Sequence, residues 1–104
     1  MSLDIYVTCQ CCGATEDINL THNLRRMAAE AGIGDLLWRD EPCKASDLAE
    51  PVAAALADLR VRPDHYRQFN APNGWGTYEW FLQGIERLHE ACSRNGDAEV
   101  EFSR

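Results

Sequence analysis

Both ends of this chain alternate between apolar and polar residues, whereas the residues between them repeat their apolar positions at a helical spacing. Near the N-terminus, residues 3–8 and 14–20 alternate in this way, a pattern typical of half-buried strands. Gly13 lies between the two runs, where a tight turn favours a residue that adopts a positive φ. We therefore predict an antiparallel β-hairpin at the N-terminus.

The middle of the chain predicts helices. From Thr21, the expected N-cap, apolar residues recur on one helical face as far as Gly32, the expected stop. Four more helical segments are predicted, over residues 36–38, 46–60, 63–69 and 77–95. Proline is tolerated only in the first turn of a helix, so Pro51 places the regular part of its helix from about Glu50 onward.

Residues 98–103 alternate again and predict an edge strand that joins the hairpin in a three-stranded sheet. The predicted fold class is α+β, with a small antiparallel sheet (the hairpin plus the C-terminal strand) packed against three to four helices. Residues 1–104 are expected to form a single domain. An unpaired C-terminal edge leaves both a monomer and a homodimer open.

The net charge of -7 narrows the choice of partners, because an acidic chain repels phosphate backbones and anionic lipid. General nucleic-acid binding and membrane binding are therefore not expected. No apolar run approaches the roughly 20 residues of a membrane span, and Asp4 interrupts the place where a signal peptide would begin. We expect a cytoplasmic protein.

The turn of the hairpin contains Cys9-x-x-Cys12-Gly13, which has the form of the first half of a zinc knuckle. A second, closely spaced pair of ligands is missing, and only the isolated His22 and Cys43 are candidates to complete a tetrahedral set. Reduced thiols without a metal are the favoured alternative, so no cofactor is expected unless zinc binds. A redox role is disfavoured because Gly13 leads into a strand and not into a helix.

The junction between the second strand and the first helix is a candidate anion site. His22 and Asn23 lie beside backbone N–H groups that the helix leaves unpaired, and Arg25 follows in the first turn. Together these residues suit a phosphate or carboxylate. Simple helix capping is the alternative for the same residues.

Asn73–Trp80 is the most informative segment. Two glycines flank Trp75, which permits a close backbone approach, and Trp75, Tyr78 and Trp80 offer flat faces for stacking. Helix-start amides near Thr77 would receive an anionic group of the same ligand. In the alternative interpretation, Trp75 folds back over the core.

These segments resemble a group of small uncharacterised proteins from phages and bacteria, often actinobacteria. The resemblance spans most of the chain and rests on four segments, residues 21–24, 66–70, 73–79 (Asn-Gly-Trp-Gly-Thr-Tyr-Glu) and 100–104. It implies the N-terminal hairpin and the short C-terminal strand but no activity. Hairpin cysteines vary within the group, and Cys11 and the unpaired Cys43 of this chain argue against a zinc site that its members share. A phage-like origin favours binding of a host protein or of a host signalling nucleotide.

No catalytic motif is present, so we predict a non-enzymatic protein. The leading hypothesis is a module that binds a small anionic, nucleotide-like molecule. Its predicted pocket comprises His22, Asn23, Arg25, Asn73, Trp75 and Tyr78. The alternative is an adaptor or inhibitor that binds a host protein through the Trp75 loop, with or without zinc on the hairpin cysteines.

Overall fold

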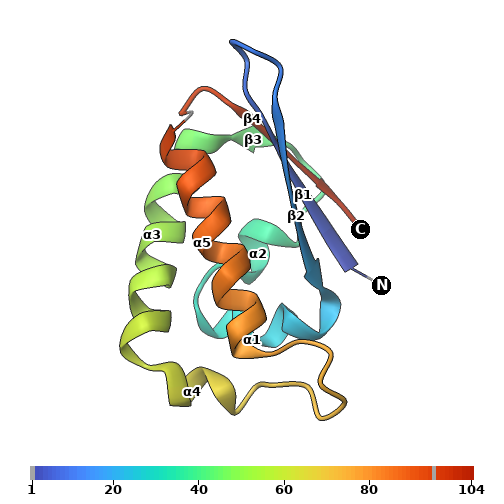
Figure 1. Cartoon of the computed structure of the whole chain (residues 1–104), viewed down its shortest axis with the longest axis vertical. Coiled ribbons are helices and arrows are strands. Elements are labelled where there is room, and N and C mark those ends of the chain that lie inside the picture. Colours follow the sequence, from blue (N-terminus) through green and yellow to red (C-terminus); the bar gives the residue numbers. More distant parts are fainter. Residues whose placement is uncertain (1, 95) are drawn as a thin grey trace.

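The computed structural model describes residues 2–94 and 96–104 of the 104-residue chain (Figure 1). In chain order its elements are β1 (Ser2–Thr8), β2 (Thr15–Thr21), the 3-10 helix η1 (His22–Leu24), α1 (Arg25–Glu30), α2 (Gly34–Leu37), β3 (Cys43–Lys44), α3 (Ala45–Val61), α4 (Pro63–Arg67), α5 (Tyr78–Arg94) and β4 (Glu99–Ser103). The fold class is α+β, as the sequence predicts.

A four-stranded antiparallel sheet in the order β2-β1-β4-β3 forms one layer. The register places Ile5 of β1 opposite Ile18 of β2, and Val7 of β1 opposite Val100 of β4. All four side chains are buried, because alternation along each strand turns them to the same face. The opposite face is polar and carries Tyr6 between acidic neighbours on β2 and β4.

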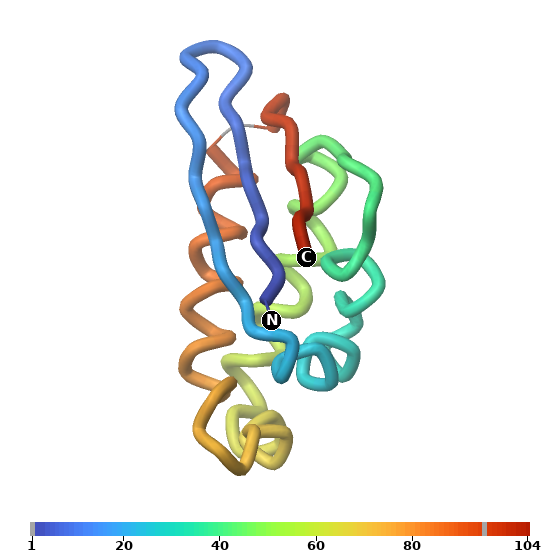
Figure 2. The backbone as a smooth tube through the Cα atoms, turned by 90° about the vertical axis from the view of Figure 1, so that its right-hand side faces the viewer, coloured from blue at the N-terminus to red at the C-terminus, as the bar shows by residue number. Residues whose placement is uncertain are grey.

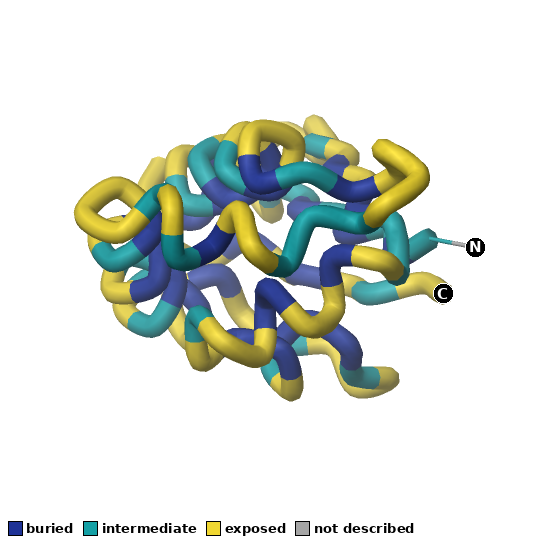
Figure 3. Tube along the Cα trace, turned by 90° about the horizontal axis from the view of Figure 1, so that it is seen from below, coloured by how far each residue is buried: buried dark blue, intermediate teal, exposed yellow. Residues whose placement is uncertain are grey.

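The helices cover the apolar face of the sheet, with α3 and α5 running beside each other (Figures 1 and 2). On α5 the apolar side chains of Phe81, Ile85 and Leu88 repeat at helical spacing and are fully buried. Seen from the α4 end, buried and exposed positions alternate along the backbone (Figure 3). None of the helices in the described ranges combines the length and apolar composition needed to cross a bilayer.

Gly84 of α5 lies in close contact with the sheet. A Cβ atom at this position would lie 2.7 Å from Cδ2 of Leu20 on β2, so the absence of a side chain permits the contact. One turn further along α5, Arg87 donates hydrogen bonds of 2.6 Å to the carboxylate of Glu16 and 2.9 Å to the main-chain oxygen of Asp17. These contacts fix α5 against β2.

The sheet has one strand more than the sequence predicts. The two-residue strand β3 pairs Cys43 with Val100 and is too short to show an alternation that a sequence pattern could reveal. As a result, β4 lies between β1 and β3 in the strand order. The prediction of a C-terminal edge is therefore wrong for Glu99 and Val100, whereas residues 101–103 pair with β1 alone in the described structure, and a homodimer stays a prediction.

Two helix boundaries also differ from the prediction. α3 begins at Ala45, so Pro51 lies inside the helix, where it removes one N–H donor to the carbonyl of Asp47. Thr21 has the extended backbone of an N-cap, but its side chain accepts no capping hydrogen bond, and the 3-10 helix η1 precedes α1. Asn95, part of the predicted stop of the last helix, lies outside the described residues.

The start of α5 is tied to the end of α3 by a buried hydrogen bond of 2.6 Å from the Tyr78 hydroxyl to the main-chain oxygen of Leu59. Tyr78→Phe would leave that buried oxygen without its partner, so we expect the free energy of unfolding to fall by about 1–2 kcal/mol. Urea unfolding measures the loss. Tyr6→Phe on the polar face of the sheet is the matched control and should change little; equal losses would contradict the assignment.

A charged corner joins α3 to α4. Arg62 donates two hydrogen bonds, of 2.9 and 2.6 Å, to the carboxylate of Asp58, which also accepts one from the Tyr66 hydroxyl. The hydrogen bonds from Arg62 and then Tyr66 lower the pKa of Asp58 from 3.8 to about 2. The corner therefore favours the charged carboxylate in the folded state.

Because the folded-state pKa of Asp58 is depressed, its contribution to stability is present above its ordinary pKa of 3.8 and is lost as the pH falls toward about 2. We expect Asp58→Asn to be less stable than the wild type at neutral pH, with the difference shrinking over that acid range. Denaturant unfolding across a pH series measures it. Glu50→Gln, which removes an exposed carboxylate from the same helix, should show no such convergence.

Candidate functional site

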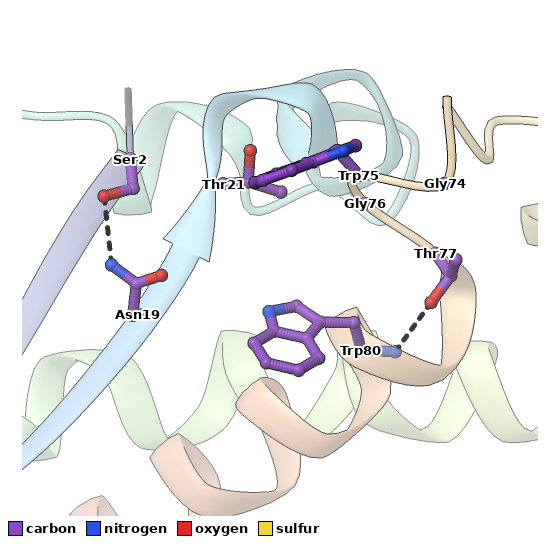
Figure 4. A pocket seen from close by; sticks show the side chains of 8 residues that line it. All are labelled: Ser2, Asn19, Thr21, Gly74, Trp75, Gly76, Thr77 and Trp80. Atoms are coloured by element: carbon purple, nitrogen blue, oxygen red, sulfur yellow. Dashed lines mark hydrogen bonds between the residues drawn. The ribbon is translucent and has the colours of Figure 1, made fainter. Parts of the chain in front are cut away.

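A cavity of about 450 Å³ lies where the start of α5 meets the end of β2 (Figure 4). We call it the tryptophan pocket. Its lining residues come from the start of β1, the end of β2, the loop before α5 and the first turn of α5, and they are Ser2, Asn19, Thr21, Gly74, Trp75, Gly76, Thr77 and Trp80. No charged side chain is among them.

Two indole rings form opposite sides of the pocket. In Figure 4 the ring of Trp75 is seen edge-on and that of Trp80 on its face, so the two walls are not parallel. Trp75 is 71% exposed and Trp80 is 54% exposed, which makes them two of the three large exposed apolar residues in the described part of the chain. Such rings offer stacking and edge contacts to a ligand.

The backbone of Trp75 is held in place although its side chain is in solvent. Asn23 donates a 2.7 Å hydrogen bond to the main-chain oxygen of Trp75, and the Trp75 N–H donates a 3.0 Å bond to the side chain of Asn73. Next to it, Gly76 has a φ of +121° and packs so closely that a Cβ would lie 3.1 Å from Cβ of Asn23. The loop thus presents the indole from a fixed backbone.

The first turn of α5 positions Trp80, and two of its backbone N–H groups already have hydrogen-bond acceptors within the protein. Thr77 is the N-cap, as predicted, and its hydroxyl accepts a 3.2 Å hydrogen bond from the Trp80 N–H. The Tyr78 N–H donates a 2.7 Å bond to the side chain of Asn70. These two amides are therefore not free to receive the anionic group that the sequence analysis expects there.

The structure brings three of the six predicted ligand-binding residues together, namely Asn23, Asn73 and Trp75. Of these, Trp75 lines the pocket and the two asparagines support its backbone. Tyr78 requires a correction, because its ring is only 4% exposed and belongs to the core. Helical geometry turns Tyr78 and Trp80, two residues apart, to different sides.

His22 and Arg25 do not line the tryptophan pocket. The ring of His22 packs edge-on against Trp38 with 6.2 Å between centroids, and its Nε2 atom is buried without a hydrogen-bond partner among the described residues. Arg25 is exposed at the start of α1. The 3-10 turn η1 changes the direction of the chain between β2 and α1, which separates both side chains from the pocket.

The polar rim of the pocket is not among the residues that the sequence predicts for the site. The amide of Asn19 donates to Ser2 at 3.0 Å and to the carboxylate of Asp4 at 2.7 Å. Alternation along β2 does place Asn19 and Thr21 on one face, which is a signal in the sequence. Their position beside Trp75 depends on a contact between distant segments that no local pattern shows.

The cysteines do not assemble the zinc set that the sequence analysis considers. Cys9 and Cys12 lie at the hairpin tip, whereas β2 runs for seven residues before His22, which places His22 about 20 Å away. In residues 2–94 and 96–104 no three His, Cys, Asp or Glu side chains are grouped so that they could hold a metal ion. The hairpin cysteines are free thiols.

Comparison with protein-family models, with curated proteins and with solved structures finds no match for this chain. The resemblance to small phage and bacterial proteins therefore stays a prediction. The functional argument depends on the geometry of the tryptophan pocket.

The fixed loop can be tested at its two glycines. In Gly76→Ala the new Cβ is forced against Asn23 at an unfavourable φ, so we expect stability to fall by roughly 3 kcal/mol. In Gly74→Ala the φ of +78° is also strained but the Cβ meets nothing within 4 Å, which predicts a loss of about 1–2 kcal/mol. Urea unfolding followed by tryptophan fluorescence compares the two, and equal losses would contradict the close approach at Gly76.

Proposed function

We propose that this protein is a non-enzymatic module that binds a small molecule with a flat ring, such as a nucleobase, in the tryptophan pocket. One observation carries the proposal: two exposed indoles, both on fixed backbone, form the walls of a single cavity. An indole ring that is exposed to water does not gain the free energy that burial of its large apolar surface would give. A ligand that inserts between the rings recovers that burial.

The size and polarity of the pocket suit such a ligand. Its volume of about 450 Å³ falls in the range of roughly 300–1,000 Å³ typical of small-molecule sites. Asn19, Thr21 and Thr77 supply hydrogen-bonding groups around the apolar walls. Such groups orient the polar edge of a heterocyclic ring while one indole stacks on its face and the other contacts its edge.

The charge of the site indicates which part of a nucleotide-like ligand would supply the affinity. The lining residues carry no cation, Asp4 adjoins the rim through Asn19, and the whole chain has a net charge of -7. A phosphate would therefore gain nothing from the pocket walls and would remain in solvent. We propose that the ring, and not the anionic group, is the part recognised.

Titration calorimetry with adenosine, guanosine and adenosine monophosphate tests this proposal. We expect a nucleoside to bind about as well as the nucleotide, and Trp75→Ala or Trp80→Ala to weaken binding about tenfold or more, because stacking on one aromatic ring contributes roughly 1–3 kcal/mol. Val61→Ala serves as the control. It removes the third exposed apolar side chain, which does not line the pocket.

Two results would overturn the proposal in different ways. Nucleotide binding that far exceeds nucleoside binding would restore the anionic group as the main determinant. Nucleoside binding that survives both tryptophan substitutions would place the ligand elsewhere. The unfolding midpoint of each variant should match that of the wild type, since both indoles are exposed.

A second function is favoured by the exposure of Trp75. At 71% exposed, on a fixed loop beside the edge strand β2, its indole has the form of an anchor for a protein partner. In that case no nucleoside binds, and Trp75→Ala abolishes capture of one specific partner while Val61→Ala does not. The adaptor or inhibitor role is thus separated from ligand binding by the same variants.

A further inference from the structure

The tip of the hairpin folds the sequence Cys9-Gln10-Cys11-Cys12 into a single helical turn. The N–H of Gly13 donates a 2.9 Å hydrogen bond to the oxygen of Cys9, which closes the turn, and Gly13 itself has a φ of +74°. The N–H of Cys9 donates a 2.8 Å bond to the oxygen of Ala14, where the strands resume. This tip projects beyond the other strands (Figures 1 and 2).

A helical turn determines which thiols face each other. Residues three apart lie on the same side, with Cβ atoms about 5–6 Å apart, whereas residues two apart do not. Cys9 and Cys12 are therefore neighbours across the turn, at a separation from which a small movement forms a disulfide. As expected from the sequence, the chain continues from Gly13 into β2 and not into a helix, so the pair lacks the helix dipole that lowers a thiol pKa in helix-start redox motifs.

The same two cysteines, without Cys11, line a cavity of about 420 Å³ beneath the tip. Ala91 and Arg94 from the end of α5 form part of its wall. Both thiols thus adjoin a space of a size that a small disulfide compound can enter, beside the guanidinium of Arg94 and the carboxylate of Glu16. Cys11, although exposed, is not part of this cavity.

The turn also favours the thiolate form of Cys9. Hydrogen bonds to the Cys9 thiol lower its pKa. The largest effects come from the backbone N–H and then the side chain of Cys12, followed by the backbone N–H of Cys11, and the smallest comes from the Cys11 side chain. The thiolate is the nucleophile in thiol–disulfide exchange. Cys9 is the residue from which we expect exchange to begin.

We propose that Cys9 and Cys12 form a dithiol–disulfide pair that exchanges with low-molecular-weight disulfides in the cavity at the hairpin tip. The Cys9 thiolate attacks one sulfur of the small disulfide, forms a mixed disulfide and releases one small thiolate. Cys12 then loses its proton and attacks the Cys9 sulfur, which releases the second small thiolate. The protein pair is oxidised by two electrons, and the small disulfide takes them together with the two thiol protons.

Intact-mass spectrometry of the reduced full chain after incubation with glutathione disulfide tests the proposal. All variants carry Cys43→Ser, which removes the half-buried thiol of β3, while Cys92 is buried. In this background we expect one internal disulfide and little retained glutathione. Cys12→Ser should retain one glutathione, because the mixed disulfide on Cys9 can no longer be resolved. Cys9→Ser should form no internal disulfide.

Cys11→Ser is the matched control, since it removes an exposed thiol of the same turn and should still form the internal disulfide. An internal disulfide that survives Cys9→Ser or Cys12→Ser, or that disappears in Cys11→Ser, would overturn the pairing. Glutathione adducts without any internal disulfide would overturn exchange by the pair. Equal unfolding midpoints of the reduced variants establish that these outcomes report on chemistry and not on folding.

Discussion

The packing of α5 along β2 is the contact on which both candidate sites depend. Gly84 lets the helix approach Leu20 closely, and the helix then runs beside the strand for most of its length. The start of α5 and the end of β2 together form the tryptophan pocket, whereas the end of α5 and the start of β2 form the cavity beneath the cysteine turn. A shift of this one helix would therefore alter both sites at once.

Burial divides the three tryptophans into one core residue and two surface residues. Trp38 is almost completely buried in the core, whereas Trp75 and Trp80 stand in solvent. A side chain as large and apolar as indole is usually covered in a folded domain. The hydrogen bonds that Asn23 and Asn73 make to the main chain of Trp75 hold its loop in a form that keeps the ring uncovered, which the proposed binding site requires.

Local patterns predicted most of the elements but little of how distant elements meet. Alternation predicted the hairpin and the C-terminal strand, and the turn formers before Thr77 predicted the cap of α5, because these features depend on neighbouring residues. The two-residue strand β3 and the helical position of Pro51 depend on tertiary packing that overrides local preference. For the same reason the sequence identified Trp75 and its two asparagines but assigned Tyr78, a core residue, to the pocket and missed the rim formed by Asn19.

Arg87 has a consequence for how copies of this chain behave toward one another. β2 is a seven-residue strand at the edge of the sheet, and such an edge is a template for further strands and for aggregation. The guanidinium of Arg87 occupies the main-chain oxygen of Asp17, and its partner Glu16 adds a charge on the same stretch. The ion pair that positions α5 thereby also hinders pairing at the β2 edge. A strand from a second copy would first have to displace the charged side chain of Arg87.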